Sequence, residues 1–512
     1  MNTKKQNIRS IQEMHRRFSD EVKISGLAEG EKIVEHNLSD VKINSIVTDS
    51  RRVTPGSAFF AIRGLKSNGE DFVEDAVKRG AKAIIAENFD SNENPGVAKI
   101  QVNNSRKALA RIAKRYHGNP DESISIVGIT GTNGKTTVST MTRHLLEEPG
   151  RPVGLIGTVR YHLGDREMPS FRTTPEAADL YPMLRNMLVG GCSEAVMEVS
   201  SHGIHQSRVS GMQMEVAVFL NLTRDHLDYH KNMEAYFVEK RKIFNGENGK
   251  LPKFAIINGD CPYGKRLMEE LPPQVRILSF GLEESNDFRA KNINLEADGA
   301  EFVLDSPAGS MVIKSPMLGR FNVMNLLASL SILHVMGRPI QDAIRKIGAF
   351  QGVDGRMESI DKGQDYNIVV DYAHTPDALR NALSMLRECT NGKVHLVFGC
   401  GGDRDKGKRL EMTKVACAGA DRVWATADNP RTESLAEIFK DMKKGQTRGS
   451  RISFIEDRRR AISMALDHAR KGDCVLIAGK GHECFQEVQY TAIPFDDREV
   501  ARELIDIKSL AE

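Results

Sequence analysis

A glycine-rich segment between an apolar run and a helical pattern is the feature that most constrains how this chain folds. The segment is Gly128–Thr137, GITGTNGKTT. The preceding Ser123–Val127 is typical of a short buried strand, and apolar residues recur at helical spacing over Val138–Glu148. A strand, a glycine-rich turn and a helix form a cradle in which backbone N–H groups and the helix N-terminus face an anion. The segment therefore predicts a phosphate-binding loop in an α/β sheet.

The loop is a variant of the common phosphate-binding spacing. That spacing has a glycine five residues before Gly134, where this chain has Ile129. The alternative is a glycine-rich turn that binds nothing. A turn needs no lysine, however, so Lys135 favours a bound nucleoside triphosphate, with the Thr136 hydroxyl directed at Mg²⁺.

Composition narrows the class of protein. A chain of 512 residues is longer than a single hydrophobic core normally organises, so several domains are expected. The formal net charge of +3 does not suggest a nucleic-acid partner, and no apolar stretch approaches the ~20 residues of a membrane span. The polar N-terminus lacks a signal sequence, and seven scattered cysteines fit a reducing compartment. We therefore expect a soluble cytoplasmic protein.

Turn signals divide the chain into three parts. Asn119-Pro120-Asp121 and Gln351–Gly355 are the expected boundaries. We therefore expect domains over residues 1–118, 119–351 and 352–512. Strand and helix patterns alternate in the last two, which predicts α/β sheets with helices on both faces. The stretch Phe288–Ser310 is not assigned to any element.

Four short apolar runs in the last third of the chain each end in a polar or glycine-rich loop. The loops are Asp371–His374, Gly401–Arg404, Asp428–Arg431 and Gly479–Glu483. Ligands of open parallel sheets bind beyond the carboxyl ends of the strands. The four loops therefore predict one shared site.

Two strand ends near the phosphate loop carry acidic and histidine side chains. The run Ala195–Val199 contains Glu198, which is either a Mg²⁺ ligand beside the loop or a solvated glutamate. The run Val216–Asn221 leads to Asp225, His226, Asp228 and His230. These four are either metal ligands or the satisfied side chains of a helix start.

Six segments follow one another in a characteristic order. They are Gly131–Thr137, Glu198–His202, Asn221–Asp228, Asn322–Asn325, Gly355–Glu358 and Asp371–Pro376. Together they resemble the Mur ligases of bacterial cell-wall synthesis, and the likeness runs from about Thr48 to the end. Within that family the chain is similar to the members that add the third amino acid of the peptide stem.

The resemblance implies a small N-terminal α/β domain for the UDP end of the substrate, a central P-loop ATPase and a C-terminal Rossmann-like domain for the amino acid. The implied ATP contacts are Gly131, Thr132, Asn133, Gly134, Lys135, Thr136, Thr137, Asn325, Arg356 and Asp371. The implied catalytic residues are Lys135, Glu198, His226 and Lys240. Two Mg²⁺ ions are implied, with Thr136, Glu198, His226 and a carbamylated Lys240 as ligands. Carbamylation makes physical sense because it turns a cation into an oxygen donor.

The resemblance also implies two substrate sites. Ser50, Lys66 and Ser67 would contact the uridine diphosphate, and Thr173, Thr174, Ser200, Gln206 and Arg208 the muramoyl-peptide end. The amino-acid site would comprise Arg404, Asp428, Asn429, Pro430, Arg431, Gly479 and Glu483. The Asp-Asn-Pro-Arg motif accompanies meso-diaminopimelate, whereas lysine-adding relatives lack its arginine. Lysine has no distal carboxylate for an arginine fork, so it would leave Arg431 and Arg404 unpaired, at a cost on the order of 2–5 kcal/mol.

The expected reaction is ATP-dependent amide formation through an acyl phosphate, adding meso-diaminopimelate to UDP-N-acetylmuramoyl-L-alanyl-D-glutamate. The expected partners are small molecules only, without nucleic acid or membrane insertion, and the chain is expected to be a monomer. Three alternatives stay open: a lysine-adding ligase, a folylpolyglutamate synthetase, and a non-catalytic ATP-binding regulator.

Overall fold

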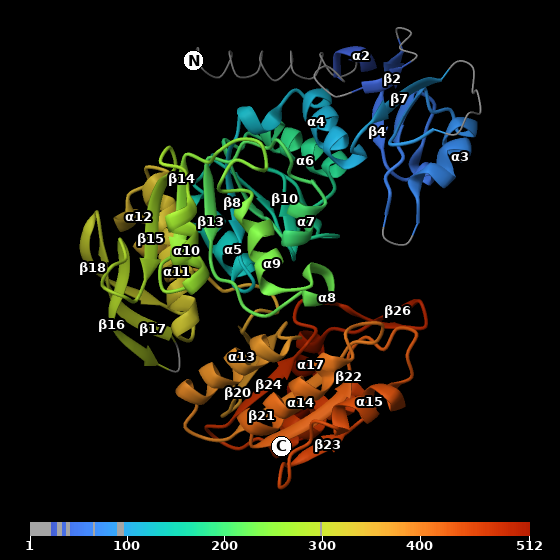
Figure 1. Ribbon diagram of the computed structural model, residues 1–512. Coiled ribbons are helices and arrows are strands. Elements are labelled where there is room, and N and C mark those ends of the chain that lie inside the picture. Colours follow the sequence, from blue (N-terminus) through green and yellow to red (C-terminus); the bar gives the residue numbers. More distant parts are fainter. Residues whose placement is uncertain are drawn as a thin grey trace.

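Three sheets of five or more strands follow one another along the part of the chain that the structure describes (Figure 1). The structure is a computed structural model that describes residues 22–27, 33–36, 41–64, 67–89, 97–296 and 299–511. In Figure 1 the blue N-terminal sheet and the orange C-terminal sheet each lie beside the green and yellow central part. The mixed α/β fold predicted from the sequence is confirmed.

The N-terminal sheet has the order β2-β7-β6-β5-β4, parallel except for β2. Its strands are β2 (Ile33–His36), β4 (Ser45–Val47), β5 (Ser57–Phe60), β6 (Ala83–Ala86) and β7 (Ala98–Val102). The helices are α2 (Ile24–Leu27), α3 (Val73–Lys78) and α4 (Ser105–Tyr116), and β1 (Val22–Lys23) pairs with β3 (Lys42–Ile43). Apolar side chains of this sheet and of α4 belong to one buried cluster with side chains of the central sheet, so the two parts share a core.

The central sheet has eleven strands in the order β11-β10-β9-β12-β8-β13-β14-β15-β16-β17-β18. The parallel part contains β9 (Val153–Ile156), β12 (Glu194–Glu198), β8 (Ser125–Thr130), β13 (Val216–Phe219), β14 (Phe254–Asn258) and β15 (Arg276–Gly281). One edge continues into β10 (Arg160–His162) and β11 (Glu167–Pro169). The other continues into β16 (Phe288–Glu296), β17 (Gly299–Ser306) and β18 (Gly309–Ser315), which cover the stretch that the sequence left unassigned.

Helices cover both faces of the central sheet, as predicted. Successive strand residues point to opposite faces. In β13, Val216 and Val218 share a cluster with α5 (Lys135–Leu146), α11 (Arg320–Val335) and α12 (Ile340–Ile347). Ala217 and Phe219 share the other cluster with α6 (Ala177–Val189), α7 (Ser201–His205), α9 (Met233–Arg241) and α10 (Pro262–Glu270). The short helix α8 (Leu227–His230) precedes α9.

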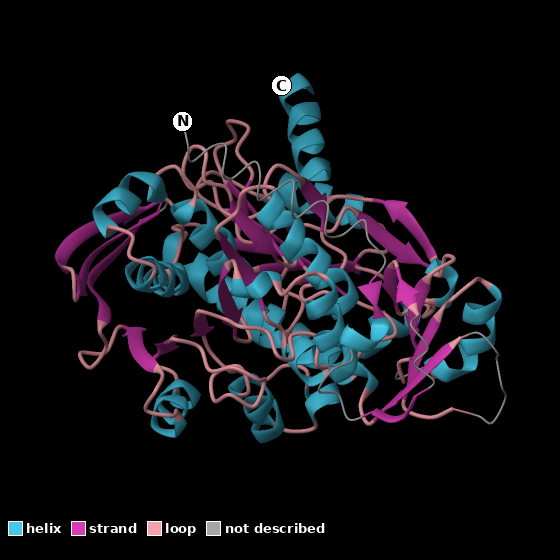
Figure 2. Ribbon diagram, turned by 90° about the horizontal axis from the view of Figure 1, so that it is seen from above, coloured by secondary structure: helices cyan, strands magenta, loops and turns pink. Residues whose placement is uncertain are grey.

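The C-terminal sheet has the order β19-β20-β24-β21-β22-β23, parallel except for β19. The strands are β19 (Glu358–Ser359), β20 (Asn367–Asp371), β24 (Cys474–Ala478), β21 (Val394–Cys400), β22 (Arg422–Ala427) and β23 (Ile452–Phe454). One face packs on α13 (Pro376–Cys389), α14 (Gly407–Gly419) and α15 (Leu435–Lys443), and the other on α16 (Arg458–His468) and α17 (Asp497–Ala511). The end of α17, marked C, projects from the molecule in Figure 2. The hairpin β25 (Phe485–Val488) and β26 (Thr491–Pro494) follows β24.

The element bounds differ from the sequence expectations mainly at the phosphate loop. The strand β8 begins after the predicted Ser123 and extends through Thr130, and α5 begins at Lys135 instead of Val138. None of the helices in the described ranges is long and apolar enough to cross a membrane.

Candidate active site

The phosphate loop follows β8, which lies between β12 and β13. Gly134 ends the loop with φ +88°, and a Cβ there would lie 2.5 Å from Asn325 Oδ1, so glycine is required. The helix α5 therefore starts at Lys135, and the N–H groups of its first turn have no partners within the helix. Asn221 holds the turn, because its Oδ1 accepts hydrogen bonds from the N–H groups of Thr132 at 3.1 Å and Asn133 at 2.9 Å.

Two lysine side chains meet beneath this loop. The Nζ of Lys135 donates to the carbonyls of Gly131 at 2.9 Å and Thr132 at 2.8 Å. The Nζ of Lys240, on α9, donates to the same Gly131 carbonyl at 2.9 Å and to Thr130 Oγ1 at 3.2 Å. Burial, together with the nearby charge of Lys135, holds the pKa of Lys240 well below its ordinary value. The pKa of Lys135 is also lowered by burial. Two amines that share one carbonyl form a site that an anion would stabilise.

Glu198 ends β12 and is fully buried next to α5. Its carboxylate accepts hydrogen bonds from Thr136 Oγ1 at 3.1 Å and from the N–H and hydroxyl of Thr158, both at 2.8 Å. A buried carboxylate beside two threonine hydroxyls is a donor set that suits Mg²⁺.

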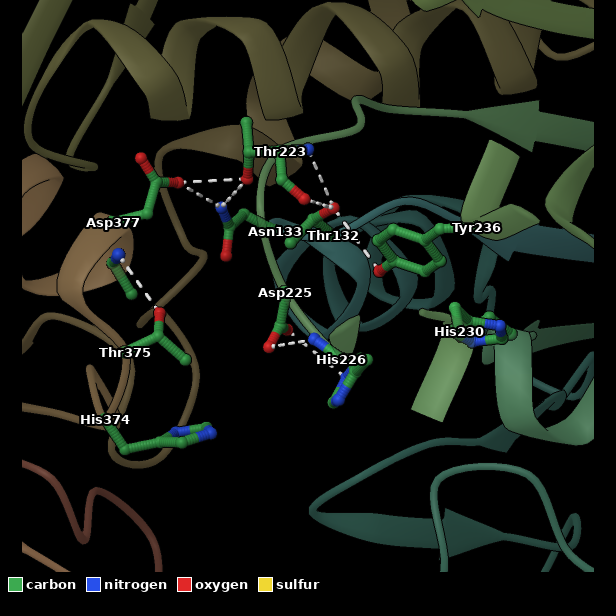
Figure 3. A network of polar contacts seen from close by, with 12 residues as sticks. Thr132, Asn133, Thr223, Asp225, His226, His230, Tyr236, His374, Thr375 and Asp377 are labelled. Carbon is green, nitrogen blue, oxygen red and sulfur yellow. Dashed lines mark hydrogen bonds and ion pairs between the residues drawn. The ribbon is translucent and has the colours of Figure 1, made fainter. Parts of the chain in front are cut away.

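The two histidines after β13 have different surroundings (Figure 3). His226 has φ +53°, and its Nε2 lies 3.2 Å from Asp225 Oδ2. His230 is buried: it contacts Ser201 Oγ at 2.9 Å and stacks on Tyr236, and burial lowers its pKa to about 4. No three His, Cys, Asp or Glu side chains of the described ranges are grouped to hold a metal. His230 is therefore a satisfied helix side chain, whereas Asp225 and His226 line the cavity. The side chain of Asp228, the fourth residue predicted here, lies outside the part of the chain that the structure describes.

A cavity of about 680 Å³ brings these residues together between the central and C-terminal sheets. Of the predicted ATP and metal contacts it is lined by Thr132, Asn133, Gly134, Lys135, Thr136, Thr137, Glu198, His226, Asn325, Arg356 and Asp371. The remaining two are adjacent to this lining: Gly131 belongs to the loop itself, and Lys240 donates a hydrogen bond to its carbonyl. Of the predicted substrate contacts it is lined by Thr173, Thr174, Ser200, Gln206 and Arg208. Residues predicted for two substrates thus surround one cavity.

The C-terminal side of the cavity is built around Asp371. Its carboxylate accepts hydrogen bonds from the N–H groups of Met357 and Ala373, both at 2.8 Å, and burial raises its pKa. The guanidinium of Arg356 lies 4.5 Å from the centre of the Tyr372 ring, a cation–π distance. On the central side, Asn325 donates to Asn322 Oδ1 at 2.9 Å.

Two of the predicted uridine-diphosphate contacts, Ser50 and Ser67, lie in the N-terminal part, outside the cavity lining. Ser50 is buried in the turn Ser50–Arg52, and Ser67 lies before the turn Gly69–Phe72. Lys66 lies outside the residues that the structure describes. Near the cavity, Arg208 is fixed, since it donates to Thr174 O and Gln206 Oε1, both at 2.7 Å.

The four predicted loops lie side by side, because β20, β24, β21 and β22 are neighbours in the sheet. Asp371–His374 lines the large cavity and the other three loops do not, so they form an adjoining site rather than one shared with it. Asn429 is its centre: its Nδ2 donates to Glu483 Oε2 at 2.8 Å. Arg431 has φ +53°, and its Nη1 donates to Gly402 O at 2.8 Å.

Backbone packing explains the remaining predicted members of this adjoining site. Gly479 has φ +116°, and a Cβ there would lie 2.6 Å from Asp428 Oδ2. Pro430 O would lie 1.8 Å from a Cβ on Gly402, so these two chain segments are in close contact. Arg404 is exposed beside Gly401.

Sequence reasoning missed two charged residues here. Asp377 on α13 accepts hydrogen bonds from Thr223 Oγ1 at 3.0 Å and Asn133 Nδ2 at 3.3 Å, and so joins the C-terminal part to the phosphate loop (Figure 3). Lys480 is fully buried and donates to Asn429 Oδ1 and Glu483 Oε2, both at 3.1 Å. Asp377 follows the predicted segment Asp371–Pro376 directly and Lys480 lies within the predicted loop Gly479–Glu483, which was the available signal.

Comparison with known proteins assigns the family. Residues 42–117 match the Mur ligase family, catalytic domain, residues 129–333 the Mur ligase middle domain, and residues 355–481 the Mur ligase, glutamate ligase domain. The chain is 41% identical to UDP-N-acetylmuramoyl-L-alanyl-D-glutamate–2,6-diaminopimelate ligase of Listeria monocytogenes, over 91% of this chain and 95% of that protein. The protein of the same name from Geobacillus kaustophilus is 42% identical, over 91% and 96%. A solved structure of a ligase of that name has a TM-score of 0.68 and 35% identity, and covers 96% of this chain and 100% of its own. The chain therefore belongs to the Mur ligase family.

Proposed function

We propose that this chain is an ATP-dependent ligase that joins meso-diaminopimelate to UDP-N-acetylmuramoyl-L-alanyl-D-glutamate during peptidoglycan precursor synthesis. The observation that carries the proposal is the identity of 41–42%, over 91% of the chain, to diaminopimelate ligases. The intact Asp428–Arg431 motif beside Glu483 supports the choice of amino acid. The intact motif disfavours the lysine-adding ligase. The presence of Lys135, Lys240 and Glu198 disfavours a non-catalytic regulator.

The ATP triphosphate would bind on the first turn of α5. The unpaired N–H groups there and the Lys135 ammonium face the same cavity, which supports a polyanion. Asn325 on one side of the cavity and Arg356 and Asp371 on the other would contact the remainder of the nucleotide.

Mg²⁺ would be held by oxygen and nitrogen ligands around Glu198, with Thr136 and His226 as further members. When bound, it neutralises phosphate charge. Lys240 would join this set as a carbamate. A neutral amine is the form that reacts with carbon dioxide, and the lowered pKa of Lys240 supports that form. Two ions are proposed on this basis.

The chain's own residues would align the reaction. Thr173, Thr174, Ser200, Gln206 and Arg208 would hold the peptide end of the UDP substrate so that its D-glutamate carboxylate attacks the γ-phosphate of ATP. An acyl phosphate and ADP form, and Lys135 stabilises the charge that develops on the transferred phosphoryl group. The diaminopimelate amine then attacks the acyl carbon, and phosphate leaves. No covalent enzyme nucleophile is needed.

The UDP moiety would contact Ser50, Lys66 and Ser67, and the distal end of diaminopimelate would contact Arg404, Arg431 and Glu483. We also propose domain boundaries after residues 118 and 351, a monomer, and a cytoplasmic site of action, where ATP is available.

Phosphate release by the purified protein tests the proposal. The assay contains ATP, Mg²⁺ and UDP-N-acetylmuramoyl-L-alanyl-D-glutamate, and compares meso-diaminopimelate with L-lysine. We expect turnover with diaminopimelate. Turnover with lysine alone would refute the proposed amino acid, and no turnover with either would refute the ligase.

A further inference from the structure

The hairpin β25–β26 is seated on the Asp428–Arg431 motif. The Arg431 N–H donates to Glu487 O at 2.9 Å, and the Gln489 N–H donates to Arg431 O at 2.8 Å. The Glu487 N–H donates to Asn429 Oδ1 at 3.0 Å. All three bonds use the hairpin's main chain. They hold Arg431 in its left-handed conformation whatever side chain position 487 carries.

The side chain of Glu487 has a separate contact with the guanidinium. Arg431 Nε donates to Glu487 Oε2 at 2.9 Å, and Arg431 Nη1 donates to Gly402 O at 2.8 Å. The Arg431 side chain is 20% exposed and that of Glu487 36%. These two bonds orient the planar group, and Nη2 has no hydrogen-bond partner among the residues that the structure describes. The expectation that lysine would leave Arg431 unpaired is therefore wrong, because Glu487 pairs with it.

A second ion pair lies on the other side of Asn429. Lys480 Nζ and Glu483 Oε2 are 3.1 Å apart, and both contact the Asn429 amide. Asn429 thus connects Lys480–Glu483 with Arg431–Glu487. The distal end of diaminopimelate carries one ammonium and one carboxylate, so it can pair with an anionic group of these two ion pairs and with a cationic group. The end of a lysine side chain carries only an ammonium, so it can pair only with an anionic group.

We propose that Glu487 is a positioning residue that orients the Arg431 guanidinium for the distal carboxylate of diaminopimelate. The inference rests on the proposed function. Glu487 holds Nε, so the Nη2 end remains to donate to the substrate carboxylate. The Glu487 carboxylate and the substrate carboxylate would bind different edges of the same guanidinium, which the planar five-donor fork of arginine permits. Glu487 therefore supports substrate binding and does not compete with it.

Steady-state kinetics of Glu487→Ala and Glu487→Gln test this role. We expect Glu487→Ala to raise the KM for diaminopimelate about tenfold, the factor expected when one charge-assisted hydrogen bond is lost, with kcat changed less than about twofold. Glu487→Gln keeps an acceptor for Nε, so its KM should rise less. The KM values for ATP and the UDP substrate should stay unchanged. Glu503→Ala is the matched control, because Glu503 pairs with Arg459 on the surface of the same domain.

A double-mutant cycle separates positioning from an independent effect. If Glu487 acts through Arg431, Glu487→Ala should change the diaminopimelate KM less than about twofold in an Arg431→Ala background. A lower or unchanged KM in the single variant would overturn the inference, as would an equal loss in both backgrounds or a rise in every KM. Those outcomes would leave wild-type turnover with diaminopimelate intact, whereas absence of wild-type turnover would refute the proposed function itself.

Discussion

Replacing Arg458 by methionine should unfold the C-terminal part at lower urea concentration. Arg458 begins α16 and Asp497 begins α17, and neither side chain is exposed. The Nε and Nη2 atoms of Arg458 each lie 2.7 Å from a carboxylate oxygen of Asp497. The guanidinium also donates to the carbonyls of Ala427 at 3.1 Å and Ala478 at 3.0 Å, the last residues of β22 and β24.

The magnitude follows from what the substitution leaves behind. Arg458→Met leaves the Asp497 carboxylate buried without its cation, at a cost of about 3–5 kcal/mol. The double variant Arg458→Met/Asp497→Leu removes that charge, but the two carbonyls still lose their donor, at about 1 kcal/mol each. The double variant should therefore be more stable than the single variant and less stable than the wild type.

The chain supplies its own probe for this measurement. Trp424, the single tryptophan, is fully buried on β22 in the cluster that contains α16 and α17. Urea unfolding followed by its fluorescence gives the three free energies. A single variant within about 1 kcal/mol of the wild type, or a double variant no more stable than the single one, would refute the reasoning.

Three further outcomes follow from other parts of the molecule. Lys135→Ala should abolish ADP release with Trp424-monitored unfolding unchanged; near-normal turnover would contradict the phosphate-loop assignment. Asp377→Ala removes the acceptor shared by Thr223 and Asn133, so kcat/KM for ATP should fall about tenfold, for the loss of two hydrogen bonds to a carboxylate; an unchanged value would show that this contact is not needed. Arg409 holds the pKa of Glu433 at about 2, below the ~4.3 of an unfolded chain. The stabilisation that the ionised Glu433 carboxylate gives the folded chain is therefore complete above about pH 5 and is lost as the pH falls toward 2. Glu433→Gln should thus flatten the pH dependence of stability in that range. A pH profile that matches the wild type would contradict this assignment.

Local patterns determined much of the nucleotide site. Gly134, Lys135 and Thr136 are adjacent in the chain, and the strand and helix beside them bury apolar residues with clear periods. The antiparallel strands β16–β18 escaped prediction because most of their outward residues are polar and exposed, a pattern that a loop shares.

Contacts between segments far apart in the chain could not be predicted in the same way. Asp377 meets Asn133 from 244 positions away, and Glu487 meets Arg431 across 56. Neither pair has a local period or spacing, and only the packing of β25–β26 on the motif brings a carboxylate to Arg431. Because Glu487 pairs with Arg431, bound lysine would not leave Arg431 unpaired, and the energetic cost expected from the sequence does not apply to this arginine.

The sequence by itself determined the α/β class, the phosphate loop and the positions of its charged side chains, since each depends on residues within one turn or one strand. The tertiary structure decided which charges pair. It placed Lys240 and Lys135 on one carbonyl and joined two ion pairs through Asn429. It also buried His230 against Ser201, whereas His226 lines the cavity. Charge pairing depends on distance in space, and that distance is set by how strands far apart in the chain become neighbours in a sheet.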